Sequence, residues 1–154
     1  QYEGKIKYSS LKLEKSFDFG KWTLDNSIIY QIINQNEDIL NLPKFMSRNT
    51  FFFSERIFRN TLAIQTGINF KIFSKYYANE YNPLISDFHI QNQKKIGSFP
   101  LFDFFFNAKI RQTKIFIIAE HINSSFTGNN FYSTPESVYR DFGVRFGFKW
   151  NLFN

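Results

Sequence analysis

The sequence contains no cysteine and little glycine, proline or histidine: 7 Gly, 4 Pro and 2 His in 154 residues. Without cysteine there is no disulfide framework, no thiol catalysis and no zinc site built on thiolates. No apolar run approaches the ~18–20 residues that a membrane helix needs. Gln1 is not followed by a basic and then apolar leader, so we expect a secretion signal to be absent or already removed. The length corresponds to one domain at most.

Aromatic residues, in contrast, are abundant. They make up 21% of the chain, as 22 Phe, 8 Tyr and 2 Trp, yet the formal net charge is +6 and the mean hydropathy is only −0.34. Charged residues account for 21%, a little below the usual ~25%, which argues against disorder. Many aromatics with an even mean hydropathy arise when apolar and polar residues alternate, because averaging over both faces hides the pattern.

The alternation is clearest near the C-terminus. Successive side chains of a strand point to opposite faces, and from 141 to 152 one parity is apolar while the other is polar or glycine. The same pattern predicts strands at Leu62–Lys71, Leu101–Arg111 and Trp22–Ile32. The segment Lys114–Asn123 is apolar on both parities, so its facing stays open. Together with candidates at Lys5–Phe17 and Phe51–Phe58, we predict about seven strands.

The connections between these segments alternate in length. We expect short links at Asp18–Lys21, near Asn60 and near Gln112, and long links at Asn36–Ser47, Lys75–Gly97 and Ser124–Pro135. Short turns on one side and long loops on the other are typical of outer-membrane β-barrels. The alternation of apolar and polar residues and the alternation of link lengths together favour an all-β fold, an antiparallel transmembrane β-barrel.

A soluble β-sandwich that buries the apolar faces is the alternative. Long strands, bulky Phe at consecutive positions of one face, and Lys and Arg beside glycine on the other favour the membrane barrel. Single-chain barrels usually have an even number of strands and at least eight. We therefore expect residues 1–154 to be one incomplete barrel domain, the C-terminal part of a larger barrel.

The two parities predict two sets of functional side chains. Basic residues predominate in the polar set and would favour anions in a pore, although these charges could instead simply pair across strands. The expected lumen-lining residues are Lys71, Asp103, Lys109, Arg111, Asp141, Arg145 and Lys149. The expected lipid-facing or aromatic-girdle residues are Trp22, Tyr30, Ile68, Phe70, Phe102, Phe106, Phe142, Phe146, Phe148 and Trp150.

Other chemistries find little support. His121 follows Glu120, but consecutive strand residues point apart, so we expect no catalytic site. His89 with Asp87 is a poor metal-ligand set, and Asn36–Asp38 lacks the spacing of a calcium loop; we expect no metal and no cofactor. Aromatic and cationic side chains on opposite faces do not make a nucleic-acid stacking surface.

Several segments, in order and spacing, resemble the C-terminal part of the putative porin family of Bacteroidota outer membranes, over roughly Pro43 to Asn154. They are Leu62–Asn69, Ser74–Ala78, Tyr81–Pro83, Phe88–Gln91, Ile96–Asp103, Phe106–Ile110, Glu120–Asn123 and Phe142–Trp150. The resemblance implies a β-barrel in the bacterial outer membrane that lets small solutes or ions diffuse passively. The alternative is a barrel without an open pore that serves as a structural subunit of a larger complex. The expected partners are outer-membrane lipid and other outer-membrane proteins.

Overall fold

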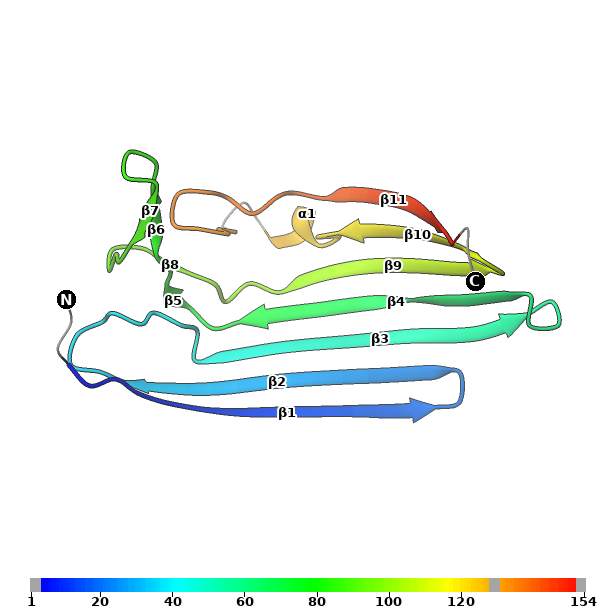
Figure 1. The fold of residues 1–154 in the computed structure, drawn as a ribbon, viewed down its shortest axis with the longest axis horizontal. Helices are drawn as coiled ribbons and strands as arrows, with labels where there is room; N and C mark the ends of the chain where they lie inside the picture. Colours follow the sequence, from blue (N-terminus) through cyan, green and yellow to red (C-terminus); the bar gives the residue numbers. More distant parts are fainter. Residues whose placement is uncertain (1–3, 128–130, 152–154) are drawn as a thin grey trace.

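The computed structural model describes residues 4–127 and 131–151, and their regular structure is β-strand except for one short helix. Seven long strands form one antiparallel sheet in the order β1-β2-β3-β4-β9-β10-β11 (Figure 1). Their bounds are β1 Lys7–Phe19, β2 Trp22–Asn34, β3 Phe45–Ile57, β4 Leu62–Phe73, β9 Leu101–Ile110, β10 Thr113–Glu120 and β11 Gly143–Trp150. The about seven strands predicted from the alternation are thus present.

The strand register keeps like parities together across the sheet. Ile68 pairs with Phe51 and Phe104, and Asn69 pairs with Thr50 and Asp103. Since directly paired residues share a face, the sheet has one apolar and one polar side. The open facing of 114–123 is settled by the same register: Ile117 lies beside Phe106 and Phe146 on the apolar face, and Lys114 lies beside Lys109 and Lys149 on the polar face.

The connections differ at the two ends of the sheet, as predicted. Tight turns join β1 to β2, β3 to β4 and β9 to β10 at one end, where Gly20, Asn60 and Arg111 have positive φ angles of 68°, 67° and 51°. The other end carries the long connections (Figure 1). They hold the short strands β5 (Tyr76–Tyr77), β6 (Glu80–Asn82), β7 (Asp87–His89) and β8 (Lys95–Ile96), and the helix α1 (Ser124–Thr127). The predicted loop residues Gly128, Asn129 and Asn130 lie outside the described residues.

The sheet is not closed into a barrel. Within residues 4–127 and 131–151, β1 and β11 are its two edges and pair with no strand on their outer sides. Nor does a second layer of sheet cover the apolar face in this part of the chain. Large apolar side chains of every long strand are exposed there, including Trp22, Ile68 and Phe146. Among the described residues, no helix has the length and apolar character needed to cross a membrane.

Candidate functional site

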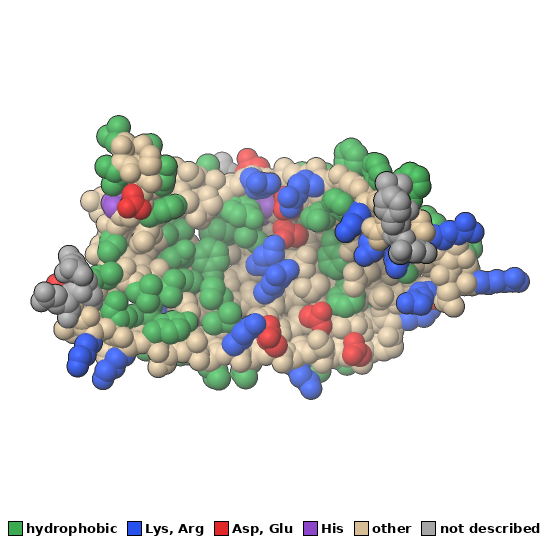
Figure 2. Space-filling view, in the orientation of Figure 1, with side chains coloured by type: hydrophobic (Ala, Val, Ile, Leu, Met, Phe, Trp, Pro, Cys, Tyr) green, Lys and Arg blue, Asp and Glu red, His purple; other side chains and the backbone are tan. Residues whose placement is uncertain are grey.

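Most of the charged side chains in the seven long strands lie on the polar face of the sheet. Over β1 to β4 this face is hollowed into a cavity of about 830 Å³, lined among others by Lys12, Asp25, Arg48, Thr50 and Lys71. Figure 2 shows basic and acidic side chains mixed over the middle of this face, with apolar side chains toward the end that carries the long connections. The face therefore offers water a charged surface with apolar side chains at one end.

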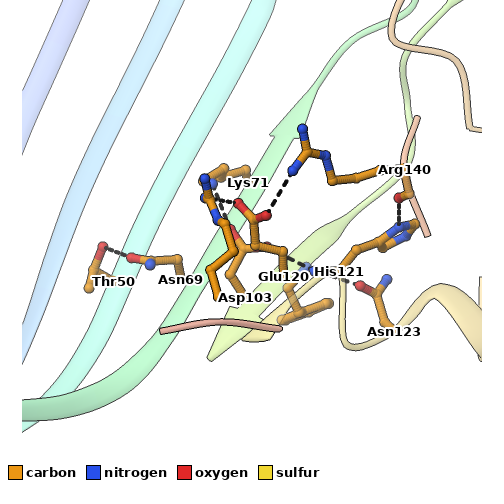
Figure 3. A network of polar contacts seen from close by, with 10 residues as sticks. Thr50, Asn69, Lys71, Asp103, Glu120, His121, Asn123 and Arg140 are labelled. Atoms are coloured by element: carbon orange, nitrogen blue, oxygen red, sulfur yellow. Dashed lines mark hydrogen bonds and ion pairs between the residues drawn. The ribbon is translucent and has the colours of Figure 1, made fainter. Parts of the chain in front are cut away.

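An ion pair at the middle of this face links β4 to β9. Lys71 Nζ lies 2.6 Å from Asp103 Oδ2, and Asp103 is almost fully buried. The second carboxylate oxygen, Oδ1, accepts a hydrogen bond of 3.0 Å from the backbone N–H of His121. Figure 3 shows Asp103 between these two partners. The buried carboxylate is thus satisfied on both oxygens, as a charge removed from water requires.

Glu120 forms a second charge cluster beside the first. Its carboxylate pairs with Arg140 at 3.3 Å and also with Arg145. Arg140 belongs to the long connection before β11, whereas Arg145 lies in β11 itself. Because one acid serves two cations, the cluster keeps one net positive charge on the polar face (Figure 3).

The side chain of His121 holds the connection between β10 and β11 in place over the polar face. Its side chain has no exposed area, and Nδ1 lies 2.9 Å from the backbone oxygen of Arg140. The ring packs edge-on against Phe131 at 4.6 Å and Tyr139 at 5.6 Å between centroids. Phe131 in turn belongs to a buried cluster with Phe99, Leu101, Phe73 and Tyr139. Since Leu101 has the parity of Asp103, this cluster covers the polar side of the sheet.

The long connections contain several titratable side chains that lie close together. His89 of β7 is 3.6 Å from Glu80 of β6. A hydrogen bond that the protonated Glu136 carboxyl donates to Glu80, together with the repulsion between the two carboxylates, raises the pKa of Glu136, while His89 and Lys94 lower it. Nearby, burial raises the pKa of the Tyr76 phenol. These contacts join the segment 80–94 to the turn at 133–137.

The expected lumen residues do not all lie on strands. Lys71, Asp103, Lys109, Arg145 and Lys149 share the polar face. Arg111 lies in the turn between β9 and β10, and Asp141 precedes β11, so strand alternation does not place either side chain. The register brings Lys71 and Asp103 into contact but leaves Lys109 and Lys149 in a separate group near the short turns.

The expected lipid-facing residues lie, with one exception, on the apolar face. Phe142 precedes β11 and is exposed there. The others are Trp22, Tyr30, Ile68, Phe70, Phe102, Phe106, Phe146, Phe148 and Trp150.

Sequence reasoning missed several charged residues of the polar face. Lys12, Arg48 and Arg56 lie in strands to which no facing was given, and Lys114 lies in the segment whose facing stayed open. For Arg56 and Lys114 the missing signal is the phase of the neighbouring strand, because only cross-strand register decides which parity is polar. Arg140 comes from a connection that carries no periodic pattern.

No group of three or more His, Asp or Glu side chains that could hold a metal ion is present among residues 4–127 and 131–151. His121 and Glu120 do not contact each other; His121 turns into the aromatic cluster, whereas Glu120 meets arginines. What the polar face can do is attract, hold or repel charged solutes.

The comparisons with known proteins give one match. A family model described as "Putative porin" matches residues 1–154. No curated protein and no solved structure matches the chain.

Proposed function

Because the chain belongs to the family described as "Putative porin", we propose that it contributes its seven strands to a β-barrel in the bacterial outer membrane. In this proposal the polar face lines a water-filled lumen and the apolar face touches acyl chains. The barrel has no enzymatic step: small solutes or ions pass by diffusion, selected by the width and charge of the lumen. The proposal extends to the Bacteroidota outer membrane, and the resemblance noted above supports it.

One observation carries the proposal, the exposure of the apolar face. Phe146, Phe148 and Trp150 of β11 are 84%, 75% and 61% exposed, and similar side chains continue over all seven strands. A contiguous apolar surface of this extent is unfavourable in water and marks contact with lipid or protein. In lipid every backbone N–H and C=O needs a partner, so a spanning sheet has to close. The open edges at β1 and β11 are therefore where further strands would pair.

The long connections favour a second candidate function. The cluster of Phe99, Leu101, Phe131, Phe73 and Tyr139 covers part of the polar face at one end. A lumen covered in this way would be narrow or plugged. The barrel would then act as a structural subunit of a larger outer-membrane complex and would use its loops or lipid-facing surface to bind a partner protein.

Conductance across planar bilayers tests the two functions. The complete protein that contains this chain, purified in detergent, is added to one side of the membrane. Discrete ohmic steps support the porin. Absence of steps from protein that is folded, together with a stoichiometric partner retained through purification, supports the structural subunit instead.

Two neighbouring positions of β4 test which face is wet. Gln65 lies on the polar face and Ile64 on the apolar face, and these 154 residues contain no cysteine. We expect a water-soluble methanethiosulfonate reagent to modify Gln65→Cys and to reduce the conductance. The control Ile64→Cys should stay unmodified in lipid. Equal modification of both variants would contradict the assignment of the faces.

A further inference from the structure

We propose that the polar face holds a binding site for phosphate-type oxyanions near the short turns, made by Arg56, Lys109, Lys114 and Lys149. These four residues are named the basic row. The proposal rests on the proposed function to the extent that the polar face is accessible to water. It adds the site and the class of solute that the site retains.

The register places the basic row on one level of the sheet. Ala63 of β4 pairs with Arg56 on one side and with Lys109 on the other. Lys114 pairs with both Lys109 and Lys149. Because adjacent strands are ~4.8 Å apart, the four cations follow one another across β3, β9, β10 and β11. Figure 2 shows basic side chains gathered toward this end of the molecule.

Within the described part of the chain, no acidic residue forms an ion pair with the basic row. The polar-face residues two positions further along the strands, away from the short turns, carry no charge either to neutralise the row. They are Ser54, Gln65, Asn107, Phe116 and Gly147. Like charges directly opposite one another across strands are destabilising. A bound anion between them would remove that repulsion.

Two cations in the middle of the same face have acidic partners. Lys71 pairs with Asp103, and Arg145 shares Glu120; Arg48, opposite Lys71, forms none of the ion pairs of the described residues. The paired cations hold the sheet and connection together, and their acids lower the excess of positive charge there. The difference between the two levels points to a structural role for the middle and a binding role for the basic row.

A hollow beside the basic row has the lining that an oxyanion needs. It encloses about 280 Å³ and is lined by Arg56, Asn60, Thr61, Ala63, Lys109 and Arg111. Arginine and lysine supply charge-assisted hydrogen bonds to phosphate oxygens, and Asn60 and Thr61 add an amide and a hydroxyl donor. The small side chain of Ala63 leaves the space between Arg56 and Lys109 open.

Equilibrium binding of inorganic phosphate to the complete protein in detergent tests the site. We expect the double variant Lys109→Gln/Lys114→Gln to raise the phosphate dissociation constant about two- to fivefold for each charge removed, since exposed charge pairs have energies of that size. Binding should also weaken as ionic strength rises. Phosphate should bind more tightly than chloride, because valence multiplies the attraction to several cations.

Two further variants control for the change in net charge and for misfolding. Lys5→Gln/Lys44→Gln removes the same charge from exposed positions outside the strands and should leave phosphate binding unchanged. Lys109→Arg/Lys114→Arg keeps the charge and should keep binding. Equal weakening by the Lys5 and Lys44 double variant, or parental binding by Lys109→Gln/Lys114→Gln, would overturn the basic row as a site.

Conductance recorded on the same preparations distinguishes this proposal from the function on which it rests. A protein that does not conduct, yet binds phosphate through the basic row, would refute the open pore and support the site. A protein that conducts, yet binds phosphate independently of the basic row, would refute the site and support the pore.

Discussion

His121 adopts a backbone conformation that non-glycine residues rarely take, with φ at 52°. This left-handed geometry costs about 1–2 kcal/mol, and the buried ring contacts with Phe131 and Tyr139 offset it. The contacts of His121 come from the far end of a long connection, and no periodic pattern links those residues to it. Its packing role therefore could not be predicted.

Replacing His121 tests whether it fastens this connection. We expect His121→Ala to destabilise the folded protein by about 2–4 kcal/mol, because it removes a buried ring, and to expose residues 131–140 to protease. His121→Asn, which tolerates the left-handed backbone, should lose the ring contacts but not add strain, and should be less destabilised. Thermal melting and limited proteolysis in detergent measure both. Parental protease resistance of His121→Ala would contradict the role.

Gly67 occupies a position without room for a side chain. A Cβ atom there would lie 2.3 Å from the backbone oxygen of Phe51 and 2.6 Å from Cβ of Phe52. We expect Gly67→Ala to cost about 1–3 kcal/mol, the usual range for overpacking. Gly143→Ala is the control, since nothing lies within 4 Å of its Cβ position. Urea unfolding of both variants in detergent measures the difference. Equal unfolding midpoints would show that β3 and β4 can move apart at Gly67 at no cost in stability.

At the scale of elements, alternation predicted the long strands well, and it failed where the pattern is broken. β3 begins at Phe45, earlier than the predicted Phe51, because Ser47 and Asn49 place polar residues on the parity of Phe51. Pairing with β2 and β4 recruits that segment into the sheet. The strands β5 to β8 have two or three residues each, too few for any period to show.

Substitution of Ile68 tests whether the apolar face contacts hydrocarbon at mid-strand. We expect Ile68→Lys to reduce the free energy of folding into lipid vesicles by about 2–4 kcal/mol, the cost of a lysine near the bilayer midplane. Ile68→Ala controls for lost volume, and Gln65→Lys places the same charge on the polar face, where the cost should be small. Equal stability of Ile68→Lys and Gln65→Lys would show that Ile68 does not face hydrocarbon.

The contact between β6 and the turn at 133–137 should depend on pH. Because the pKa of Glu136 is raised in the folded state, the protein binds this proton more tightly than the unfolded chain does. The resulting stabilisation is present below the ordinary glutamate pKa and is lost as the pH rises through the raised value. We expect amide hydrogen exchange in Glu80–His89, corrected for intrinsic rates, to be slower at pH 5 than at pH 8.

Glu136→Gln provides the control for this dependence. An amide stays neutral and hydrogen-bonds at every pH, so the difference between the two pH values should shrink. Slower exchange at pH 8 than at pH 5 in the parent protein would contradict the sign derived for Glu136.

At the scale of the whole molecule, the two tryptophans mark one end of the sheet. Trp22 begins β2 and Trp150 ends β11, and both lie beside the short turns on the apolar face. Tryptophan prefers the interface between headgroups and acyl chains. In vesicles of brominated lipids we therefore expect fluorescence quenching of both to be strongest for bromines near the headgroups and to coincide in depth. Trp22→Phe and Trp150→Phe separate the two signals, and emission insensitive to bromine would contradict contact with lipid.

The two edges of the sheet are unequal. β1 has 13 residues and β11 has 8, so a seam that joined them directly would leave several peptide groups of β1 facing hydrocarbon without a hydrogen-bonding neighbour. Such groups are too costly in a bilayer to remain bare. In the proposed barrel, the strand that pairs with β1 therefore has to be longer than the strand that pairs with β11.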